Sequence, residues 1–446
     1  MAEEEGRPEA RPAGDVEDVP SVDGPTLQVR AQPVYGPAWI STIDRAVPFS
    51  PISVSGRYVA ARLLVTVGSV PVGMATVRLD RGHASADRVC RAVHGQLGPL
   101  RPVPMPTLCH EPVTAVVATR GRPNSLARCV RSILAGDHPA ITVLVVDNDP
   151  DDDRTAQAVR ALGDPRVRYI RESRRGASVG RNRGLFEADT QVVLFTDDDT
   201  EVDRAWAVRM AGAFAKDPTL ACTSGPVLAA RLDTEQERAA DTALAWNKGF
   251  LARRFSLQDP PPDSAIFPFS PGLFGIGANM AVRTRFARAV GGFDEALGPG
   301  TPTHGGEDGE FMIRLILAGH AVGYEPSALL WHHHRVDGDS MRVQLRGYAV
   351  GLSALLTKIA LDRQARHAAL RRLPAAVAQM RTISEREADA GEGMPEDTAR
   401  LRVGGTLRGP GAYVMARRAV RRAGGRVPAL SPVSRRNTER AAPSVT

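Results

Sequence analysis

The feature that most constrains the fold is an alternation of apolar runs and amphipathic segments in the middle of the chain. The runs "VTAVVAT" (113–119), "ITVLVVDN" (141–148) and "QVVLFTDDD" (191–199) are rich in β-branched residues, as is typical of strands buried on both faces. The segments between them, such as "NSLARCVRSILAG", carry apolar residues at helical spacing. This alternation predicts an α/β fold with a doubly wound, mainly parallel sheet.

Acidic residues follow the last of these strands. In "VVLFTDDDTEVD" three carboxylates, those of Asp197, Asp198 and Asp199, come directly after the apolar run. Ligands of such sheets bind beyond the carboxyl ends of the strands, where Thr119 and Asp147 are also expected. Carboxylates are costly to bury together unless something positive lies among them. A divalent cation, Mn²⁺ or Mg²⁺, is therefore favoured over an exposed acidic turn, with Asp197 and Asp199 pointing the same way.

The arginine-rich stretch "RESRRGASVGRNRG" (171–184) supplies positive charge before this strand. Arginine forks match phosphate oxygens, and the start of the following helix adds its positive end. An exposed basic loop is the alternative. The stretch also contains G-x-S-x-G around Ser178, but charged residues rather than a strand precede it, so a hydrolase nucleophile is rejected.

Two later segments carry further candidate residues. "GPGTPTHGGEDGEF" (298–311) predicts a flexible glycine-rich loop that ends in Glu307 and Asp308 at a helix start. A carboxylate there could accept a proton from an incoming hydroxyl, although acids also cap helices. "WHHHR" places His332 and His334 on one face of an extended segment, where either could complete a metal site or simply pack.

The rest of the chain divides by composition. Residues 1–46 are acidic and proline-rich, and we expect them to be disordered. Residues 47–105 contain "ARLLVTVGSVPVGMATVRLD", which predicts a β-hairpin in a small β-rich domain. Residues 112–337 hold the alternating pattern. Apolar spacing predicts a helical extension over 338–380, and 381–446 form an Arg/Pro/Gly-rich tail that we expect to be loosely structured.

Charge and cysteine usage bear on the location of the protein. No run of about 18 apolar residues is present, and the acidic N-terminus does not resemble a secretory signal. The four cysteines have no CxxC spacing, which favours reduced thiols and a cytoplasmic location. The C-terminal residues 361–446 carry seventeen arginines and eight acidic residues. Such a tail is most simply explained as solvated, but it could also contact nucleic acid or bring the protein to the inner face of a membrane as a peripheral contact.

Taken together, these segments resemble the family 2 glycosyltransferases of the GT-A fold over about residues 113–335. "VVATRGRPNSLARCVRSIL" is similar to the family's first strand and helix, and "VLVVDNDPDD" is similar to its second strand. "GASVGRNRGL" is similar to its phosphate-side turn, and "VLFTDDD" is similar to its metal-binding D-x-D. "GIGANMAVRTRFARAVGGFDEAL" and "GGEDGEFMIRLILAGH" are similar to its acceptor-side segments.

The resemblance implies an inverting, metal-assisted hexosyltransferase that uses a nucleoside-diphosphate sugar and a hydroxyl acceptor, which could be a glycan, a lipid-linked glycan or a small molecule. Asp308 would be the general base, with Glu307 beside it. The late histidine near the metal would be His332 or His334, and Asp199 is the favoured direct ligand of the D-x-D. The residues expected to bind the nucleotide sugar are Thr119, Arg120, Arg122, Asp147, Arg175, Arg181, Asp197 and Asp198. Those expected to bind the metal are Asp197, Asp199, His332 and His334.

Three alternatives remain at this stage. A sugar nucleotidyltransferase would require a glycine-rich phosphate loop with a lysine after the first strand, and "ATRGRPNSL" has one glycine and no lysine. A protein that binds nucleic acid or a membrane surface through the basic C-terminus would bind independently of the D-x-D, and its binding would weaken strongly as the salt concentration rises. Aromatic residues make up only 5% of the chain, so no nucleic acid partner is expected.

Overall fold

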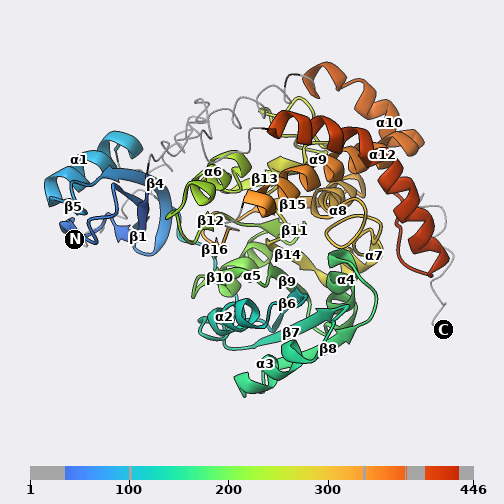
Figure 1. Cartoon of the computed structure of the whole chain (residues 1–446), viewed down its shortest axis with the longest axis horizontal. Helices are drawn as coiled ribbons and strands as arrows, with labels where there is room; N and C mark the ends of the chain where they lie inside the picture. Colours follow the sequence, from blue (N-terminus) through green and yellow to red (C-terminus); the bar gives the residue numbers. More distant parts are fainter. Residues whose placement is uncertain (1–35, 100–102, 335–337, 377, 379–396, 431–446) are drawn as a thin grey trace, which may run out of the picture.

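A computed structural model describes residues 36–99, 103–334, 338–376, 378 and 397–430. Within these residues the chain forms an N-terminal unit, a central sheet with helices on both faces, and a C-terminal helical extension (Figure 1). The N-terminal unit lies at the left of the molecule, and the helical extension lies at the upper right (Figure 1).

The N-terminal unit is a three-stranded sheet with one helix. Its strands β1 (Ala38–Asp44), β3 (Ala60–Val67) and β4 (Val70–Arg78) lie in the order β1-β3-β4, and α1 (Ala86–Leu97) packs on β4. Strands β3 and β4 form the predicted antiparallel hairpin, while β2 (Ile52–Ser53) and β5 (His83–Ala84) form a short second ladder.

The N-terminal unit begins earlier than the sequence suggested. Strand β1 lies within residues 1–46, which were expected to be disordered, and it pairs in parallel with β3. The expectation was wrong for residues 38–44 because their stability comes from hydrogen bonds to a strand elsewhere in the chain, which local composition does not reveal. The rest of the proposed disordered segment up to residue 35 lies outside the described residues.

The central sheet has eight strands in the order β13-β15-β11-β14-β9-β6-β7-β8. Strands β9, β6, β7 and β8 run parallel to one another, whereas β14 runs antiparallel to both of its neighbours. The predicted mainly parallel, doubly wound α/β sheet is therefore confirmed. The strands are β6 (Val113–Thr119), β7 (Ile141–Asn148), β8 (Val167–Glu172), β9 (Val192–Asp197), β11 (Leu220–Ser224), β13 (Arg253–Phe255), β14 (Asn279–Arg283) and β15 (Ala321–Tyr324).

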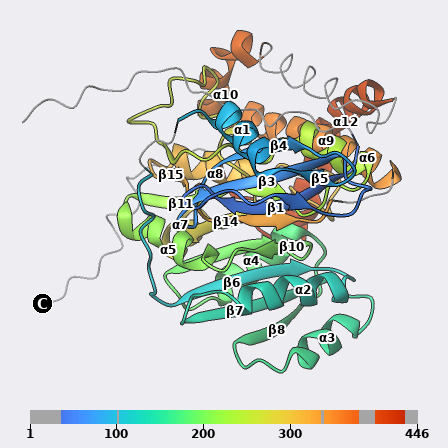
Figure 2. The same cartoon turned by 90° about the vertical axis from the view of Figure 1, so that its left-hand side faces the viewer.

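Helices cover both faces of this sheet and give it two hydrophobic cores. Figure 2 shows α2 and α3 lying over the side of β6, β7 and β8 that faces the viewer. The helices of that core are α2 (Pro123–Leu134), α3 (Arg154–Leu162) and α5 (Trp206–Lys216). The helices of the opposite core are α4 (Ala177–Glu187), α7 (Thr284–Ala289) and α8 (Glu307–Leu317).

The strand order predicts a ligand crevice at the carboxyl ends of two central strands of the sheet, β6 and β9. The chain runs outward from β6 to β7 and β8 and then returns to form β9 on the other side of β6. At such a reversal the connections diverge, which leaves a ligand crevice beyond the carboxyl ends of the two strands. Thr119 ends β6 and Asp197 ends β9, so the acidic residues lie at this point.

A small three-stranded sheet closes one side of the crevice. Its strands β10 (Thr200–Val202), β16 (Leu330–His332) and β12 (Val227–Ala229) lie in the order β10-β16-β12, so the histidines end up beside the residues that follow β9. Helix α6 (Glu235–Leu244) and the short η1 (Pro271–Leu273) belong to the connections around it.

The C-terminal extension consists of α9 (Gly338–Leu361), α10 (Arg363–Leu370) and α12 (Thr398–Arg422). The first two lie in the predicted helical segment. The loose tail expected over 381–446 is wrong for residues 398–422, because Gly405 and Gly409 form a contact surface where α9 approaches α12 closely. Residues 381–396 and 431–446 lie outside the described residues. Within the described part of the chain, no helix is both long and apolar enough to cross a membrane.

Candidate active site

Arg122 neutralises part of the acidic cluster. It lies between β6 and α2, and its guanidinium donates to Asp198 Oδ1 at 2.9 Å and to Asp199 Oδ2 at 3.0 Å. The hydroxyl of Thr119 donates to the other oxygen of Asp198 at 2.6 Å. Strand β9 ends at Asp197, and the next two residues form a turn. Asp198 and Asp199 therefore share one arginine, contrary to the strand-like alternation expected for Asp197 and Asp199.

Arg181 is the second cation of the crevice. It projects from α4, is almost fully buried, and donates to Asp197 Oδ1 at 2.9 Å and to Glu307 Oε1 at 2.8 Å. The guanidinium thus joins the end of β9 to the start of α8, two segments that are far apart in the sequence. Charge-assisted pairs of this kind fix the relative position of the two carboxylates.

Asp308 lies in the first turn of α8 and is partly exposed to the crevice. Its carboxylate accepts hydrogen bonds from the backbone N–H of Gly277 at 2.8 Å and of Gly309 at 2.7 Å. A Cβ at position 277 would lie 3.1 Å from the Asp308 Cβ and 3.5 Å from the Arg181 guanidinium carbon. Glycine at 277 therefore lets the backbone approach both side chains closely.

The histidine segment contributes to the crevice from β16. His332 Nε2 lies 3.1 Å from Asp199 Oδ1, and its buried Nδ1 has no hydrogen-bond partner among the described residues. His333 points the other way and meets Glu201 at 2.6 Å. His334 is buried, and burial followed by the neighbouring His332 lowers its pKa to about 3.

Trp246 packs against both of the inward-facing histidines. Its ring centroid lies 4.7 Å from that of His332 and 5.2 Å from that of His334. The indole therefore limits the rotation of His332 relative to Asp199. No pattern in the sequence around "LAWNKGF" indicated this role, because the contact depends on a long connection after α6.

Negative charge exceeds positive charge in this crevice. The carboxylates of Asp198 and Glu307 are both buried, and burial raises the pKa of each. Burial raises the pKa of Asp198 to about 6 although Arg122 opposes the shift. Burial, and then the charge of Asp308, raise the pKa of Glu307 against the effect of Arg181. Such shifts cluster at functional sites.

Three of the expected nucleotide-sugar-binding residues have their contacts outside the acidic cluster. Asp147, at the end of β7, is fully buried and accepts a hydrogen bond from the Tyr169 hydroxyl at 2.8 Å. Arg120 lies at the rim, where its guanidinium pairs with Asp151 at 3.0 Å. Arg175 is exposed beside Gly300, and within the described residues it has no ion-pair partner.

The start of α4 is occupied by other parts of the protein. The backbone N–H of Gly176 donates to the Asn148 side chain at 2.8 Å, and that of Ala177 donates to the Pro299 carbonyl at 2.9 Å. Ser178 is fully buried and donates to the Leu297 carbonyl at 2.7 Å. Its hydroxyl therefore holds α4 against the glycine-rich loop, consistent with its rejection as a nucleophile.

Tyr348 is a crevice residue that the sequence did not indicate. It belongs to α9 and is 41% exposed, and its hydroxyl accepts a hydrogen bond from Gln344 at 3.0 Å. Burial of the phenol, and then the negative charges of the crevice beginning with Asp308, raise its pKa. Its reach to Asp308 follows from the way α9 folds back, which helical periodicity alone cannot predict.

Two glycines hold α9 in this position. A Cβ at Gly347 would lie 3.3 Å from the His304 Cβ, and one at Gly351 would lie 2.6 Å from the backbone of Gly305. The helix therefore rests directly on the loop that leads to Asp308. That loop also carries its own hydrogen bonds, including one from the Thr301 hydroxyl to the Gly298 carbonyl at 2.8 Å.

No complete metal site is formed by side chains alone. Within the described residues, no three histidine, cysteine, aspartate or glutamate side chains form a ready-made cation site. Asp199 Oδ1 and His332 Nε2 nevertheless lie side by side, and the other ring nitrogen of His332, Nδ1, has no hydrogen-bond partner among the described residues. A divalent cation that takes its other ligands from phosphate oxygens and water fits this arrangement.

Residues 114–275 match the family described as Glycosyl transferase family 2. The "Succinoglycan biosynthesis protein ExoO" of Rhizobium meliloti is 30% identical over 258 residues, which cover 56% of this chain and 69% of that protein. The chain belongs to glycosyltransferase family 2, as its resemblance predicted.

Two further similarities were found. The "Pre-mycofactocin glycosyltransferase" of Mycobacterium tuberculosis is 31% identical over 234 residues, covering 51% of this chain and 44% of that protein. The chain thus spans less than half the length of that relative. The mannosyltransferase PcManGT from Pyrobaculum calidifontis, solved with GDP-Man and Mn²⁺, has a TM-score of 0.44 at 19% identity, covering 71% of this chain and 88% of that chain.

Proposed function

We propose that the chain is an inverting glycosyltransferase that moves a hexosyl group from a nucleoside-diphosphate sugar to an acceptor hydroxyl. The charge balance of the crevice is the observation that supports this function most. The guanidinium groups of Arg122 and Arg181 are shared among four carboxylates, and a fifth carboxylate accepts hydrogen bonds from backbone N–H groups only. The four are those of Asp197, Asp198 and Asp199 at the end of β9 and Glu307 at the start of α8, and the fifth is that of Asp308.

The nucleoside would bind where β6 and β7 end. Thr119, Arg122 and Asp147 come from adjacent strands or the turn that follows, and the Tyr169 hydroxyl orients the Asp147 carboxylate. A carboxylate fixed in this way is suited to accept hydrogen bonds from ribose hydroxyls or base N–H groups. Arg120 at the rim would contribute to the same end of the donor site.

The diphosphate would lie between the acidic turn and Arg181. Asp199 and His332 would hold a divalent cation, Mn²⁺ or Mg²⁺, because the Asp199 oxygen that does not bond to Arg122 lies beside the His332 ring. Asp197 bonds to the buried Arg181, and His334 packs on Trp246. When bound, the cation would neutralise negative charge on the departing nucleoside diphosphate. Arg181 and the exposed Arg175 would add positive charge on the phosphate side.

Asp308 would act as the general base. Hydrogen bonds from two backbone N–H groups fix the orientation of its carboxylate at the start of α8. It would accept the proton of the acceptor hydroxyl while the oxygen attacks the anomeric carbon on the face opposite the diphosphate. One displacement of this kind forms the new glycosidic bond, breaks the bond to the diphosphate and inverts the configuration.

Tyr348 would line the acceptor side of the same crevice. Its phenol is within electrostatic reach of Asp308 and remains partly exposed. A hydroxyl in this position could donate a hydrogen bond to the acceptor. The helical extension would then belong to the acceptor site, although it lies outside the residues that match the family.

A donor screen tests the proposed function. The full chain is incubated with UDP- and GDP-sugars and simple hydroxyl acceptors, with Mn²⁺ or with EDTA, and the product configuration is read by NMR. We expect one donor to give a product of inverted configuration, with turnover lost in Asp147→Asn and kept in the control Asp164→Asn. A product with retained configuration would contradict the mechanism, and a lack of binding by every donor would overturn the function.

A further inference from the structure

Helix α12 has a buried face and an exposed face. The buried face packs against α9 and the segment around Ala296, and it consists of Gly405, Gly409, Ala412, Tyr413 and Ala416. Helical geometry places Arg400, Leu407, Met415 and Arg418 on the opposite side, since they are separated by seven, eight and three residues. All four are exposed.

The exposed face carries large apolar side chains. Leu407 is 77% exposed and Met415 is 61% exposed, and Val403 beside them is 60% exposed. Isolated apolar residues on a surface require no explanation, but a series along one helix face is typical of a binding surface.

The same face is strongly basic. Residues 398–422 contain seven arginines and no acidic residue. On the exposed side, Arg400, Arg408, Arg418 and Arg422 alternate with the apolar residues. Basic and apolar residues that share the outer face of a helix are the features of a helix lying at a membrane interface.

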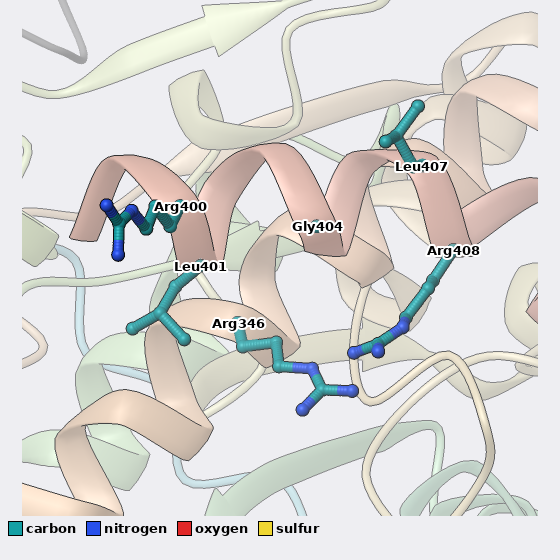
Figure 3. A pocket seen from close by; sticks show the side chains of 6 residues that line it. All are labelled: Arg346, Arg400, Leu401, Gly404, Leu407 and Arg408. Carbon is teal, nitrogen blue, oxygen red and sulfur yellow. The ribbon is translucent and has the colours of Figure 1, made fainter. Parts of the chain in front are cut away.

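A groove between α9 and α12 concentrates this positive charge. Its volume is about 410 Å³, and none of the described residues that line it is acidic. Figure 3 shows the guanidinium groups of Arg346 from α9 and Arg408 from α12 extending toward one another. Leu407 and Leu401 also line the groove. Two facing guanidinium groups repel each other unless an anion lies between them.

We propose that this surface docks on an anionic phospholipid membrane, with a lipid phosphate between Arg346 and Arg408 and with Leu407 and Met415 in the interface. Phosphate oxygens match arginine forks, and the apolar side chains would leave water on docking. A nucleic acid offers the phosphates but not the apolar layer, so the combination favours lipid. A neighbouring hollow of about 470 Å³ is lined by Pro302 and His304 as well as by Arg408. Docking would therefore occur close to the loop that leads to Asp308.

Vesicle flotation of the full chain tests this proposal without any need for catalysis. Vesicles of phosphatidylcholine alone are compared with vesicles that also contain phosphatidylglycerol. We expect binding only to the anionic vesicles, and we expect it to weaken as salt is added. Removal of one arginine near a membrane surface reduces binding about fivefold, so the double variant Arg346→Gln/Arg408→Gln should lose about 25-fold.

Matched variants separate docking from a general effect of charge. Arg154→Gln/Arg160→Gln removes the same charge from the exposed side of α3 and should leave binding close to that of the wild type. Leu407→Ser keeps the charge and should weaken binding through the loss of apolar contact. Thermal unfolding and donor binding should be unchanged in all of these variants, since none of these side chains is buried or part of the proposed catalytic crevice.

Several results would overturn the proposal. Equal binding to neutral and anionic vesicles, no binding to either, or unchanged binding by the double variant would each do so. If inorganic phosphate raised the thermal unfolding temperature of the protein while vesicles did not bind, the groove would be a site for a free anion and not a membrane surface. Tight binding to a duplex DNA probe without vesicle binding would identify a nucleic-acid surface.

Discussion

Two glutamates in the first turn of α8 have nearly the same burial and opposite electrostatic environments. Glu310 faces Arg314, at 2.7 and 2.8 Å, and Lys358 of α9, at 2.8 Å. Burial alone would raise the pKa of Glu310, but these two cations lower it to about 2. Glu307 lies three residues earlier and shares Arg181 with Asp197, and its pKa is raised.

The difference separates a charge network that is balanced within the protein from one that is not. Behind α8, Lys358 also pairs with Asp294 at 2.7 Å, so two cations balance the carboxylates of Asp294 and Glu310. A buried network of this kind is complete without a ligand. On the crevice side of α8, where Glu307 lies, the carboxylates outnumber the guanidinium groups. This excess is expected where a ligand brings positive charge.

The largest expected effect concerns Asp308, which lies between the two glutamates. Asp308→Asn keeps the shape and one of the two backbone hydrogen bonds, because only one of its side-chain atoms can accept, and it removes the proton acceptor. We expect the rate of sugar transfer to fall by about a hundred- to ten-thousand-fold, with donor binding unchanged. Steady-state transfer assays and donor titrations measure these quantities, and Asp87→Asn in the first turn of α1 serves as the control. A variant that retains near wild-type turnover would rule Asp308 out as the base.

A substitution on the balanced side of α8, at Glu310, should lower the stability of the protein. Glu310→Gln removes one negative charge and leaves Lys358 and Arg314 with Asp294 alone. We expect the free energy of unfolding to fall by about 3 kcal/mol, because breaking a buried charge network leaves charge uncompensated. Chemical denaturation measures this change, and the exposed Glu235→Gln in the first turn of α6 is the control. An unchanged unfolding midpoint would show that the network is not balanced as described.

A substitution on the crevice side of α8, at Glu307, should have a smaller effect on stability and one of opposite sign. In Glu307→Gln the neutral amide replaces a carboxylate whose charged form is disfavoured by burial and by Asp308. We expect the free energy of unfolding to stay the same or to rise by up to about 1 kcal/mol. The same denaturation experiment tests this, since the two substitutions differ only in position. If both variants lost stability equally, the distinction between the two sides of α8 would fail.

The smallest expected effect concerns Tyr348, for which we propose a place on the acceptor side of the crevice. Tyr348→Phe removes one hydroxyl and keeps the ring. We expect the KM for the acceptor to rise about two- to tenfold with little change in donor binding, since one neutral hydrogen bond is lost. Acceptor-dependent kinetics measure the effect, and Tyr58→Phe in the N-terminal unit is the control. An equal loss of donor affinity would instead indicate that Tyr348 belongs to the donor site.

The sequence predicted the parts of this molecule that depend on local pattern. Buried β-branched runs identified β6, β7 and β9, and their alternation with helices identified the sheet and its crevice. Asp198 and Asp199 follow β9, as the sequence predicted. Their individual contacts were not predicted, because β9 ends at Asp197 and the following turn brings both side chains to Arg122.

The parts that depend on distant contacts could not be predicted. Strand β1 becomes ordered by pairing with β3, and α12 becomes ordered by packing two glycines against α9. Tyr348 reaches the crevice only because α9 folds back over the loop before Asp308. In each case the stabilising partner lies far away in the sequence, so neither composition nor periodicity around the residue indicates it.

The central claim is that a divalent cation, held by Asp199 and His332, supplies the positive charge that the crevice lacks. Calorimetric titration with UDP and GDP, in Mn²⁺ and in EDTA, tests it most directly. We expect the wild type to bind one nucleoside diphosphate tightly only with Mn²⁺, and Asp199→Ala to lose this metal dependence while the control Asp203→Ala keeps it. Binding of equal strength in EDTA, or unchanged metal dependence in Asp199→Ala, would contradict the claim.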